Sequence, residues 1–143
     1  MCEEDNNMAK RLKYRYHRNG TIPQLPSQHV FVFGSNERGL HRNPFSEIAR
    51  MAFGAEDGVY LGITGRSYAI PTTDRFIRVL TLRDIQKYVA HFVTYTHSCP
   101  DVKFWVTDLN TEKLSYKPYQ LAPLFRGCFN NCNFPQSWKP WLK

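Results

Sequence analysis

The strongest constraint on the fold lies in residues 29–54, where a strand pattern, a polar turn and a helix pattern follow one another. The β-branched and aromatic residues 30–33 form an unbroken run, typical of a strand buried on both faces. Asn43 followed by Pro44 is typical of a helix N-cap and first helical residue, and the apolar residues after it recur on one helix face. Gly54 is placed to end this helix in a left-handed conformation. We therefore expect a strand–turn–helix unit at the centre of the fold.

A ligand site is expected where this strand joins this helix. In α/β proteins, ligands bind where a strand's carboxyl end leads into a helix's amino end, because N–H groups and the helix dipole converge there. Ser35 and Asn36 end the strand, and an asparagine amide there can hold a ribose hydroxyl or orient a water. His41 can act as an acid or base, and Arg42 can neutralise a phosphate. The ordinary alternatives are a turn asparagine, a hydrogen-bonded histidine and a surface arginine.

Strand and helix patterns alternate along the rest of the chain and predict a layered α/β domain. A strand is expected over 66–72, ended by Pro71, and another over 102–107. Thr81 is a candidate N-cap for a long helix. The expected buried face of that helix consists of Leu82, Ile85, Val89, Phe92, Val93 and Thr96. A short helix is expected over 119–126, followed by a tail rich in Pro and Trp.

Residues 55–65 carry glycines at three spaced positions, Gly58, Gly62 and Gly65. Glycines at this density indicate a loop whose backbone needs positive φ or approaches another backbone segment closely. No internal repeat or low-complexity tract accompanies them.

The totals fit one globular domain: 143 residues, 42% of them hydrophobic and 22% charged. No apolar run approaches the length of a membrane helix, and the N-terminus lacks the apolar core of a signal peptide. The four cysteines form no disulfide framework, which favours a reducing cytosol. Cys128 and Cys132 have only a loose metal-like spacing without a second Cys/His pair, so we expect no zinc site and no cofactor.

The net charge of +7 favours anionic partners, such as nucleic acid or phosphorylated metabolites. Five cations lie in one tyrosine-containing segment: Lys10, Arg11, Lys13, Arg15 and Arg18. Such an arm can follow a phosphate backbone while its rings stack on bases. Basic side chains facing water also protect an edge strand from aggregation. We favour the edge strand, because no nucleic-acid-binding motif accompanies the segment.

Several segments together resemble a known family. FVFGSN, FGA, SYAIPT, LRDIQKYVAHF and KFWVT stand in this order within 31–125. They resemble a family of small phage and bacterial proteins with a macro-domain-like fold, above all uncharacterised members from T-even-type phages. The resemblance implies a three-layer α/β fold, a twisted mixed sheet flanked by helices, for a single macro-like domain over 21–143. Residues 1–20 are then a basic N-terminal segment, either part of the same domain or its edge strand.

Macro domains bind ADP-ribose or related nucleotides, and some hydrolyse ADP-ribosyl bonds. The resemblance implies that Asn36 faces the distal ribose and that two glycine-rich loops wrap the diphosphate. The chain departs from the family in both loops, since H-G-x-G corresponds to 41–44 and I-G-C-G-L-x-G-Y to 109–116. The residues that replace the family's glycines are Arg42, Pro44, Asn110, Glu112 and Ser115.

These replacements are expected to lower the affinity for a diphosphate. Glycine loops hold phosphate because their N–H groups can approach it without a Cβ and with positive φ. Pro44 removes one N–H from the helix start, and Glu112 brings a negative charge beside a phosphate. Arg42 compensates only in part, as a side-chain donor. Because each lost charge-assisted hydrogen bond is worth about 1.5–3 kcal/mol, we expect tight binding to be lost.

The candidate cleft at this site is expected to be formed by nine residues: Ser35, Asn36, His41, Arg42, Tyr68, Thr107, Asp108, Asn110 and Tyr116. Asp74, like Asp108, follows a predicted strand and is a candidate acid on position alone. No catalytic residue and no metal-ligand set can be assigned.

The resemblance and the replaced glycines together favour a diverged phage macro-like protein that acts as a non-catalytic accessory or host-takeover protein. It is expected in the cytoplasm, which is that of the host cell if the protein is phage-encoded. It is expected to bind a host protein or, weakly, an ADP-ribose-type nucleotide, and no membrane. Two alternatives stay open. One is an ADP-ribosyl hydrolase or other nucleotide-processing enzyme, and the other is a basic accessory protein that binds nucleic acid.

Overall fold

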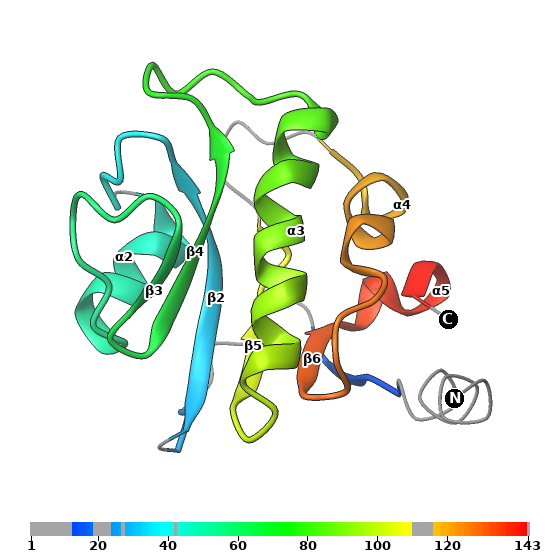
Figure 1. Ribbon diagram of the computed structural model, residues 1–143. Helices are drawn as coiled ribbons and strands as arrows, with labels where there is room; N and C mark the ends of the chain where they lie inside the picture. The colour runs from blue at the N-terminus through cyan, green and yellow to red at the C-terminus, as the bar shows by residue number, and fades with distance from the viewer. Residues whose placement is uncertain (1–12, 19–23, 27, 42, 110–115, 143) are drawn as a thin grey trace.

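The computed structural model describes residues 13–18, 24–26, 28–41, 43–109 and 116–142. They form a six-stranded mixed sheet with helices on both faces (Figure 1), which confirms the expected α/β class. The strands are β1 (Arg15–His17), β2 (His29–Asn36), β3 (Gly62–Thr64), β4 (Ser67–Thr73), β5 (Lys103–Val106) and β6 (Cys132–Pro135). The helices are α2 (Pro44–Ala52), α3 (Leu82–Ser98), α4 (Pro118–Leu121) and α5 (Lys139–Leu142), with 3-10 turns η1 (Ala122–Phe125) and η2 (Gln136–Trp138).

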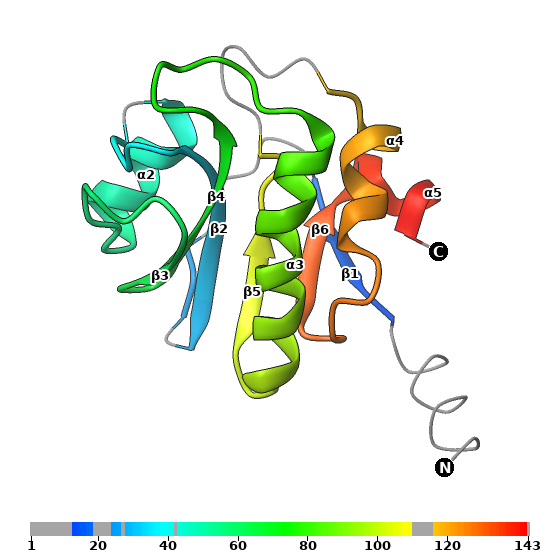
Figure 2. The ribbon, with the colours of Figure 1, turned by 45° about the horizontal axis from the view of Figure 1, so that its top comes forward.

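The strand order is β1-β6-β5-β2-β4-β3. All neighbouring strands are parallel except β3, which pairs antiparallel with β4. Helix α2 lies on one face of the sheet, and α3, α4 and α5 lie on the other (Figure 2). We call the end at which the parallel strands finish the carboxyl end of the sheet, and the end at which they begin the amino end. Ligand sites of α/β proteins lie at the carboxyl end.

The central strand β2 is buried on both faces, as its unbroken apolar sequence predicts. Val30 and Val32 belong to the core beneath α3, whereas Phe31 and Phe33 belong to the core beneath α2. Val32 and both phenylalanines are fully buried. Because β4 and β5 pair with β2 on either side, this strand joins both cores and both halves of the sheet.

The polar turn and helix after β2 also form as predicted. Asn43 caps α2, since its side chain accepts the Ser46 N–H at 3.0 Å and its own N–H donates to Ser46 Oγ at 3.0 Å. Gly54 follows the helix with a φ of +75°. Phe53, at the end of the helix, stacks on Phe31 of β2 with ring centroids 4.7 Å apart. This contact seats α2 on the sheet.

The loop after α2 returns against the end of that helix. Its glycines have positive φ, as their spacing predicted. A Cβ on Gly65 would stand 2.8 Å from the Gly54 carbonyl oxygen, closer than real side chains come. The Arg66 N–H donates to the Phe53 carbonyl oxygen at 2.7 Å. Close backbone contact thus joins the end of α2 to the β3–β4 hairpin.

The long helix α3 begins as predicted, with Thr81 Oγ1 accepting the Asp84 N–H at 3.2 Å. Of its expected buried face, four residues are buried: Ile85, Val89, Phe92 and Thr96. Leu82 and Val93 are half-buried at the margin of the same core. The helical spacing of apolar residues therefore identified the packed face.

Two expected boundaries were wrong. The strand expected to end at Pro71 continues to Thr73, and β3 pairs with β4 only as far as Ala69. The proline therefore lies where β3 no longer pairs with β4. The helix expected over 119–126 consists of α4 and η1, because Pro123 lies in the first turn of a 3-10 segment. The tail contains β6, which was not predicted, since its four residues CNFP carry no clear strand pattern.

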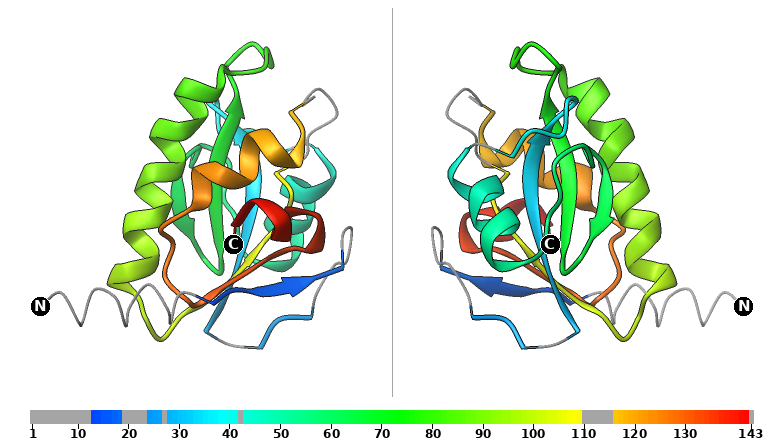
Figure 3. Two further views of the ribbon diagram at one scale, coloured as in Figure 1. Left: turned by 90° about the vertical axis from the view of Figure 1, so that its right-hand side faces the viewer. Right: turned by 90° about the vertical axis from the view of Figure 1, so that its left-hand side faces the viewer.

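The basic segment contributes β1, an edge strand parallel to β6 (Figure 3). The Tyr14 hydroxyl donates to the Cys128 carbonyl oxygen at 2.7 Å and anchors the start of the strand. The described cations of this segment are exposed: Lys13, Arg15 and Arg18. Lys10 and Arg11 lie outside the described residues. An edge strand is the arrangement that we favoured over a nucleic-acid-binding arm.

Replacing Phe92 by alanine is expected to lower the free energy of unfolding by about 3–5 kcal/mol, because a fully buried aromatic ring is lost. This ring makes edge contacts with Tyr68 and Phe104. Urea denaturation followed by circular dichroism measures the change. Gln86→Ala, at an exposed position of the same helix, is the control and is expected to shift stability by less than about 0.5 kcal/mol. Equal stability of the two variants would contradict this packing.

Candidate functional site

Predicted site residues of β2 and the chain after β5 lie at the carboxyl end of the sheet, but their side chains bind backbone groups. The Thr107 N–H and Oγ1 both donate to the Val32 carbonyl oxygen, at 3.0 and 2.8 Å. Ser35 is buried, and its Oγ donates to the Tyr60 carbonyl oxygen at 2.6 Å. Both hydroxyl groups therefore hold segments of this end together.

Asn36 closes a turn. Its Oδ1 accepts the N–H groups of Arg38 and Leu40, at 3.1 and 3.2 Å. Its Nδ2 donates to the Leu40 carbonyl oxygen at 2.7 Å, and the residue is 7% exposed. The side-chain amide of Asn36 therefore makes three hydrogen bonds to the backbone of residues 38–40. Asn36 thus has the turn role that was the ordinary alternative for it.

The main-chain N–H groups of the following loop, 37–43, are also occupied. Arg38 and Leu40 donate to Asn36 Oδ1. The other acceptors are the Thr73 carbonyl for Glu37, the Asn36 carbonyl for Gly39, Asp57 Oδ1 for His41 and Ser46 Oγ for Asn43. Arg42 lies outside the described residues. A main-chain phosphate cradle needs N–H groups that point at the ligand, so the described part of this loop forms none.

His41 supports the loop from inside. It is fully buried, and its Nε2 lies 2.9 Å from the Glu56 carbonyl oxygen. Because a carbonyl oxygen only accepts, Nε2 carries a proton and donates it. The imidazole edge packs against Phe33 with centroids 5.1 Å apart. A histidine held in this way ties two loops together and does not reach a ligand from solvent.

The chain leaving β5 crosses directly over β2. Leu109 is fully buried in the core beneath α3 and has a φ of +60°. A Cβ on Gly34 would stand 2.7 Å from the Leu109 carbonyl oxygen, so the crossing requires glycine at this point of β2. The Leu109 N–H donates to Thr107 Oγ1 at 3.3 Å. A buried leucine thus lies over the strand that the predicted cleft was expected to follow.

Tyr68 and Tyr116 have structural positions. Tyr68 lies near the start of β4, away from the turn of Asn36, and packs beneath α3 against Phe92 and Tyr95. Burial raises the pKa of Tyr68 to about 12. The Tyr116 hydroxyl donates to the Leu80 carbonyl oxygen at 2.8 Å, beside the start of α3. The structure therefore does not bring Tyr68 into a cleft with Asn36.

Of the remaining predicted residues, Asp108 is half-buried and lies toward β1. Burial lowers the pKa of His17 in β1, and the carboxylate of Asp108 opposes part of this shift. Arg42 and Asn110 lie outside the described residues, as does Glu112. Their expected roles stay predictions.

A feature that sequence reasoning missed projects from the same end of the sheet: residues 74–80, between β4 and α3 (Figure 1). Asp74 organises it, because Oδ1 accepts the N–H groups of Phe76 and Arg78 at 2.8 and 2.9 Å. Its Oδ2 accepts Arg78 Nε at 2.9 Å. The hydrogen bond from the Arg78 backbone is the main reason that the pKa of Asp74 is lowered. Asp74, a candidate acid by position, is therefore the centre of a turn.

We call residues 74–80 the arginine–phenylalanine loop. Phe76 is 68% exposed, and the guanidinium groups of Arg78 and Arg75 lie 5.1 and 5.8 Å from its ring centre. Ile77 has a φ of +63°, a conformation that costs a β-branched residue about 1–3 kcal/mol. Large apolar side chains alternating with arginines between a strand and a helix are the sequence signal for this loop.

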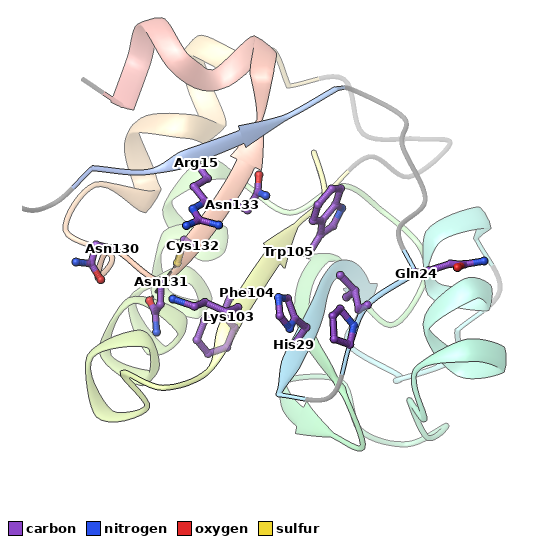
Figure 4. Close-up of a pocket in the computed structure, with 12 residues that line it drawn as sticks. Arg15, Gln24, His29, Lys103, Phe104, Trp105, Asn130, Asn131, Cys132 and Asn133 are labelled. Atoms are coloured by element: carbon purple, nitrogen blue, oxygen red, sulfur yellow. Dashed lines mark hydrogen bonds between the residues drawn. The ribbon is translucent and has the colours of Figure 1, made fainter.

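A cavity of about 350 Å³ lies at the amino end of the sheet (Figure 4). It is bordered by the starts of β2, β5 and β6, by β1 and by residues 24–26. Arg15 lines it and was predicted only as one cation of the basic segment. No sequence motif predicts a site here, because ligands of α/β proteins are expected at the opposite end.

Among the residues that the structure describes, no group of three or more His, Cys, Asp or Glu side chains could hold a metal ion. Cys128 and Cys132 are buried free thiols, and burial raises the pKa of Cys132. In the same ranges, every helix is too short or too polar to pass through a bilayer.

No protein-family model, no curated protein and no solved structure matches this chain. The chemistry of its sites therefore rests on the residues themselves, and the resemblance to macro-domain-like proteins stays a prediction.

Replacing Asn36 by alanine is expected to lower the free energy of unfolding by about 1–3 kcal/mol, because buried N–H groups lose their acceptor. Urea denaturation measures the change, with Arg50→Ala on the exposed side of α2 as the control. Unchanged stability in the Asn36 variant would contradict the turn role and return this residue to the list of ligand contacts.

Proposed function

We propose that this chain is a diverged macro-like protein of phage type that acts without catalysis, by binding a host protein in the host cytoplasm. The observation that carries the proposal is the occupied loop 37–43, whose described N–H groups all donate within the chain. A scaffold without a phosphate-binding loop can still recognise another protein through its surface.

The same loop argues against an ADP-ribosyl hydrolase. Such an enzyme must hold its substrate and place a general base beside it. His41 is fully buried and its Nε2 proton is donated to a carbonyl oxygen, while the carboxylate of Asp74 is used within its own turn. Neither group is placed to accept a proton from a bound substrate.

The arginine–phenylalanine loop supplies a surface suited to protein binding. Aromatic and arginine side chains contribute most of the binding energy at protein interfaces. The guanidinium groups of Arg75 and Arg78 lie over the Phe76 ring, and the turn around Asp74 fixes the backbone of this loop. A loop held in one conformation loses little entropy on binding. The strain at Ile77 supports a functional role, because strained backbone persists where function requires it.

The positive charge of the arginine–phenylalanine loop indicates which kind of protein surface it would bind. Arg78 is paired with Asp74, so Arg75 adds a net positive charge, and the whole chain carries +7. The complementary surface is a hydrophobic pocket for Phe76 rimmed by carboxylates. We therefore propose an acidic host protein as the partner.

Phe76→Ala is expected to abolish retention of a stoichiometric partner from bacterial host lysate, because truncating a central aromatic anchor weakens binding at least about tenfold. Arg75→Glu is expected to weaken retention as well, by repelling the acidic rim. Affinity capture with quantitative mass spectrometry measures both. Met51→Ala is the control, since Met51 is 79% exposed on α2, outside the loop. A partner retained equally by the Phe76 and Met51 variants would contradict this docking surface.

Weak binding of an ADP-ribose-type nucleotide is the second candidate function. The mixed sheet between helices is the architecture that the resemblance implies, and polar side chains still gather at its carboxyl end. Thr72 and Thr73 lie there at the end of β4. These groups favour a residual site, whereas the occupied loop argues against a tight one.

Calorimetric titration with ADP-ribose is expected to give a Kd above about 0.1 mM. Each main-chain hydrogen bond missing from a phosphate cradle weakens binding by about 1.5–3 kcal/mol, roughly ten- to a hundredfold. Titration of buffer alone gives the baseline heat. Sub-micromolar binding that survives substitution of Arg15 at the other end of the sheet would show that the carboxyl end holds the diphosphate after all.

A further inference from the structure

The cavity at the amino end of the sheet lies beside α2, over β1, β6 and β5 (Figure 4). Its volume of about 350 Å³ is at the small end of the range for small-molecule sites, about 300–1,000 Å³. Leu25 and Pro26 supply apolar wall, and several primary amides supply polar groups. The cavity is therefore sized for one small ring-containing molecule and not for a dinucleotide.

The charge of the lining favours an anion. Arg15 and Lys103 both line the cavity, and none of the described residues that line it carries a carboxylate. Figure 4 shows these two cations on one side of the cavity and Trp105 with His29 on the other. A guanidinium and an ammonium group on the same side of one cavity suit a phosphate group.

Two buried polar atoms in the lining have no hydrogen-bond partner among the described residues: Trp105 Nε1 and Asn133 Oδ1. The two residues are direct partners in the pairing of β5 with β6, so their side chains stand next to each other on the sheet. Buried polar atoms are almost always paired, and an unpaired set calls for a missing partner. A ligand edge that carries an acceptor beside a donor would satisfy both atoms.

The indole of Trp105 is held in place for such a contact. The His17 ring stacks on it with centroids 4.1 Å apart and an angle of 13° between the planes. His17 itself is fixed, because its Nε2 donates to the Val106 carbonyl oxygen at 2.7 Å. The donor of Trp105 thus has one defined direction before any ligand binds.

We propose that this cavity binds a nucleoside monophosphate, with the base edge on Trp105 and Asn133 and the phosphate between Arg15 and Lys103. Nucleobases carry neighbouring donors and acceptors on a flat ring, and a single phosphate matches the two cations. The site is separate from the arginine–phenylalanine loop, which lies at the carboxyl end of the sheet. It therefore stands independently of the proposed docking function.

The test is calorimetric titration of the full chain with AMP, GMP, CMP and UMP, each compared with its nucleoside and with inorganic phosphate. At least one monophosphate is expected to bind one-to-one with a Kd below about 1 mM, and its nucleoside at least about tenfold more weakly, since it lacks the phosphate. Absence of saturation by all four monophosphates at 10-fold higher concentration, about 10 mM, overturns the proposal.

Variants locate the site. Arg15→Gln and Lys103→Gln are each expected to weaken the monophosphate about tenfold while leaving nucleoside binding unchanged, because only the phosphate contact is removed. Trp105→Phe is expected to weaken both ligands, since it removes the indole N–H. Arg83→Gln, an exposed cation on α3, is the matched control and is expected to change neither. Unchanged affinity in both cation variants overturns the proposal.

Two further outcomes are decisive. Binding of a single-stranded oligonucleotide without binding of any monophosphate overturns the proposal in favour of a nucleic-acid surface. Melting temperatures of the Arg15 and Lys103 variants within about 2 °C of the parent show that a lost affinity reflects the site and not unfolding. None of these variants changes a residue of the arginine–phenylalanine loop. Their results therefore neither support nor contradict the proposed protein-binding function.

Discussion

The burial of β2 on both faces is the interaction on which the rest of the structure depends. Phe31 and Phe33 fill the core beneath α2, and Val30 and Val32 fill the core beneath α3. A strand in this position cannot shift by one residue, because a slip would exchange the side chains of the two cores. The fixed position of β2 sets the register of β4 and β5, which pair with it. This register in turn determines where Asn36 and Thr107 leave the sheet.

The two ends of the sheet differ in how their polar groups are satisfied. At the carboxyl end, short loops satisfy one another: Asn36 binds its own turn, His41 binds a carbonyl oxygen and Leu109 covers Gly34. At the amino end, Trp105 Nε1 and Asn133 Oδ1 are buried and have no partner among the described residues. As far as the structure describes it, the usual ligand end of an α/β sheet thus satisfies its own polar groups, while the opposite end offers directed polar atoms.

The sequence was sufficient for those elements whose signals are local. The strand at 30–33, the Asn43 cap and the helix after Thr81 each carry a pattern that needs no distant contact, and each was predicted correctly. β6 was missed because its existence depends on β5 and β1 pairing with it, not on its own four residues. Strand pairing of this kind is decided by tertiary contacts.

The candidate site was less predictable than the fold. Composition and order along the chain placed Ser35, Asn36 and Thr107 at one end of the sheet, which is where they lie. Whether a polar side chain faces a ligand or its own backbone depends on loop geometry, and Asn36 and His41 both bind backbone groups. The unpaired atoms of Trp105 and Asn133 belong to two different strands, β5 and β6, so no local sequence motif could predict that they lie side by side.

The contact between Gly54 and Gly65 has a consequence for how this protein can evolve. A Cβ on Gly65 would meet the backbone at Gly54, and neither side of that contact can give way as a side chain would. Substitution of Gly65 is therefore barred unless the hairpin is displaced from the helix, and substitution of Gly54 is strained by its φ of +75°. Among true homologues, Gly65 should therefore be retained even where every ligand-facing residue has changed.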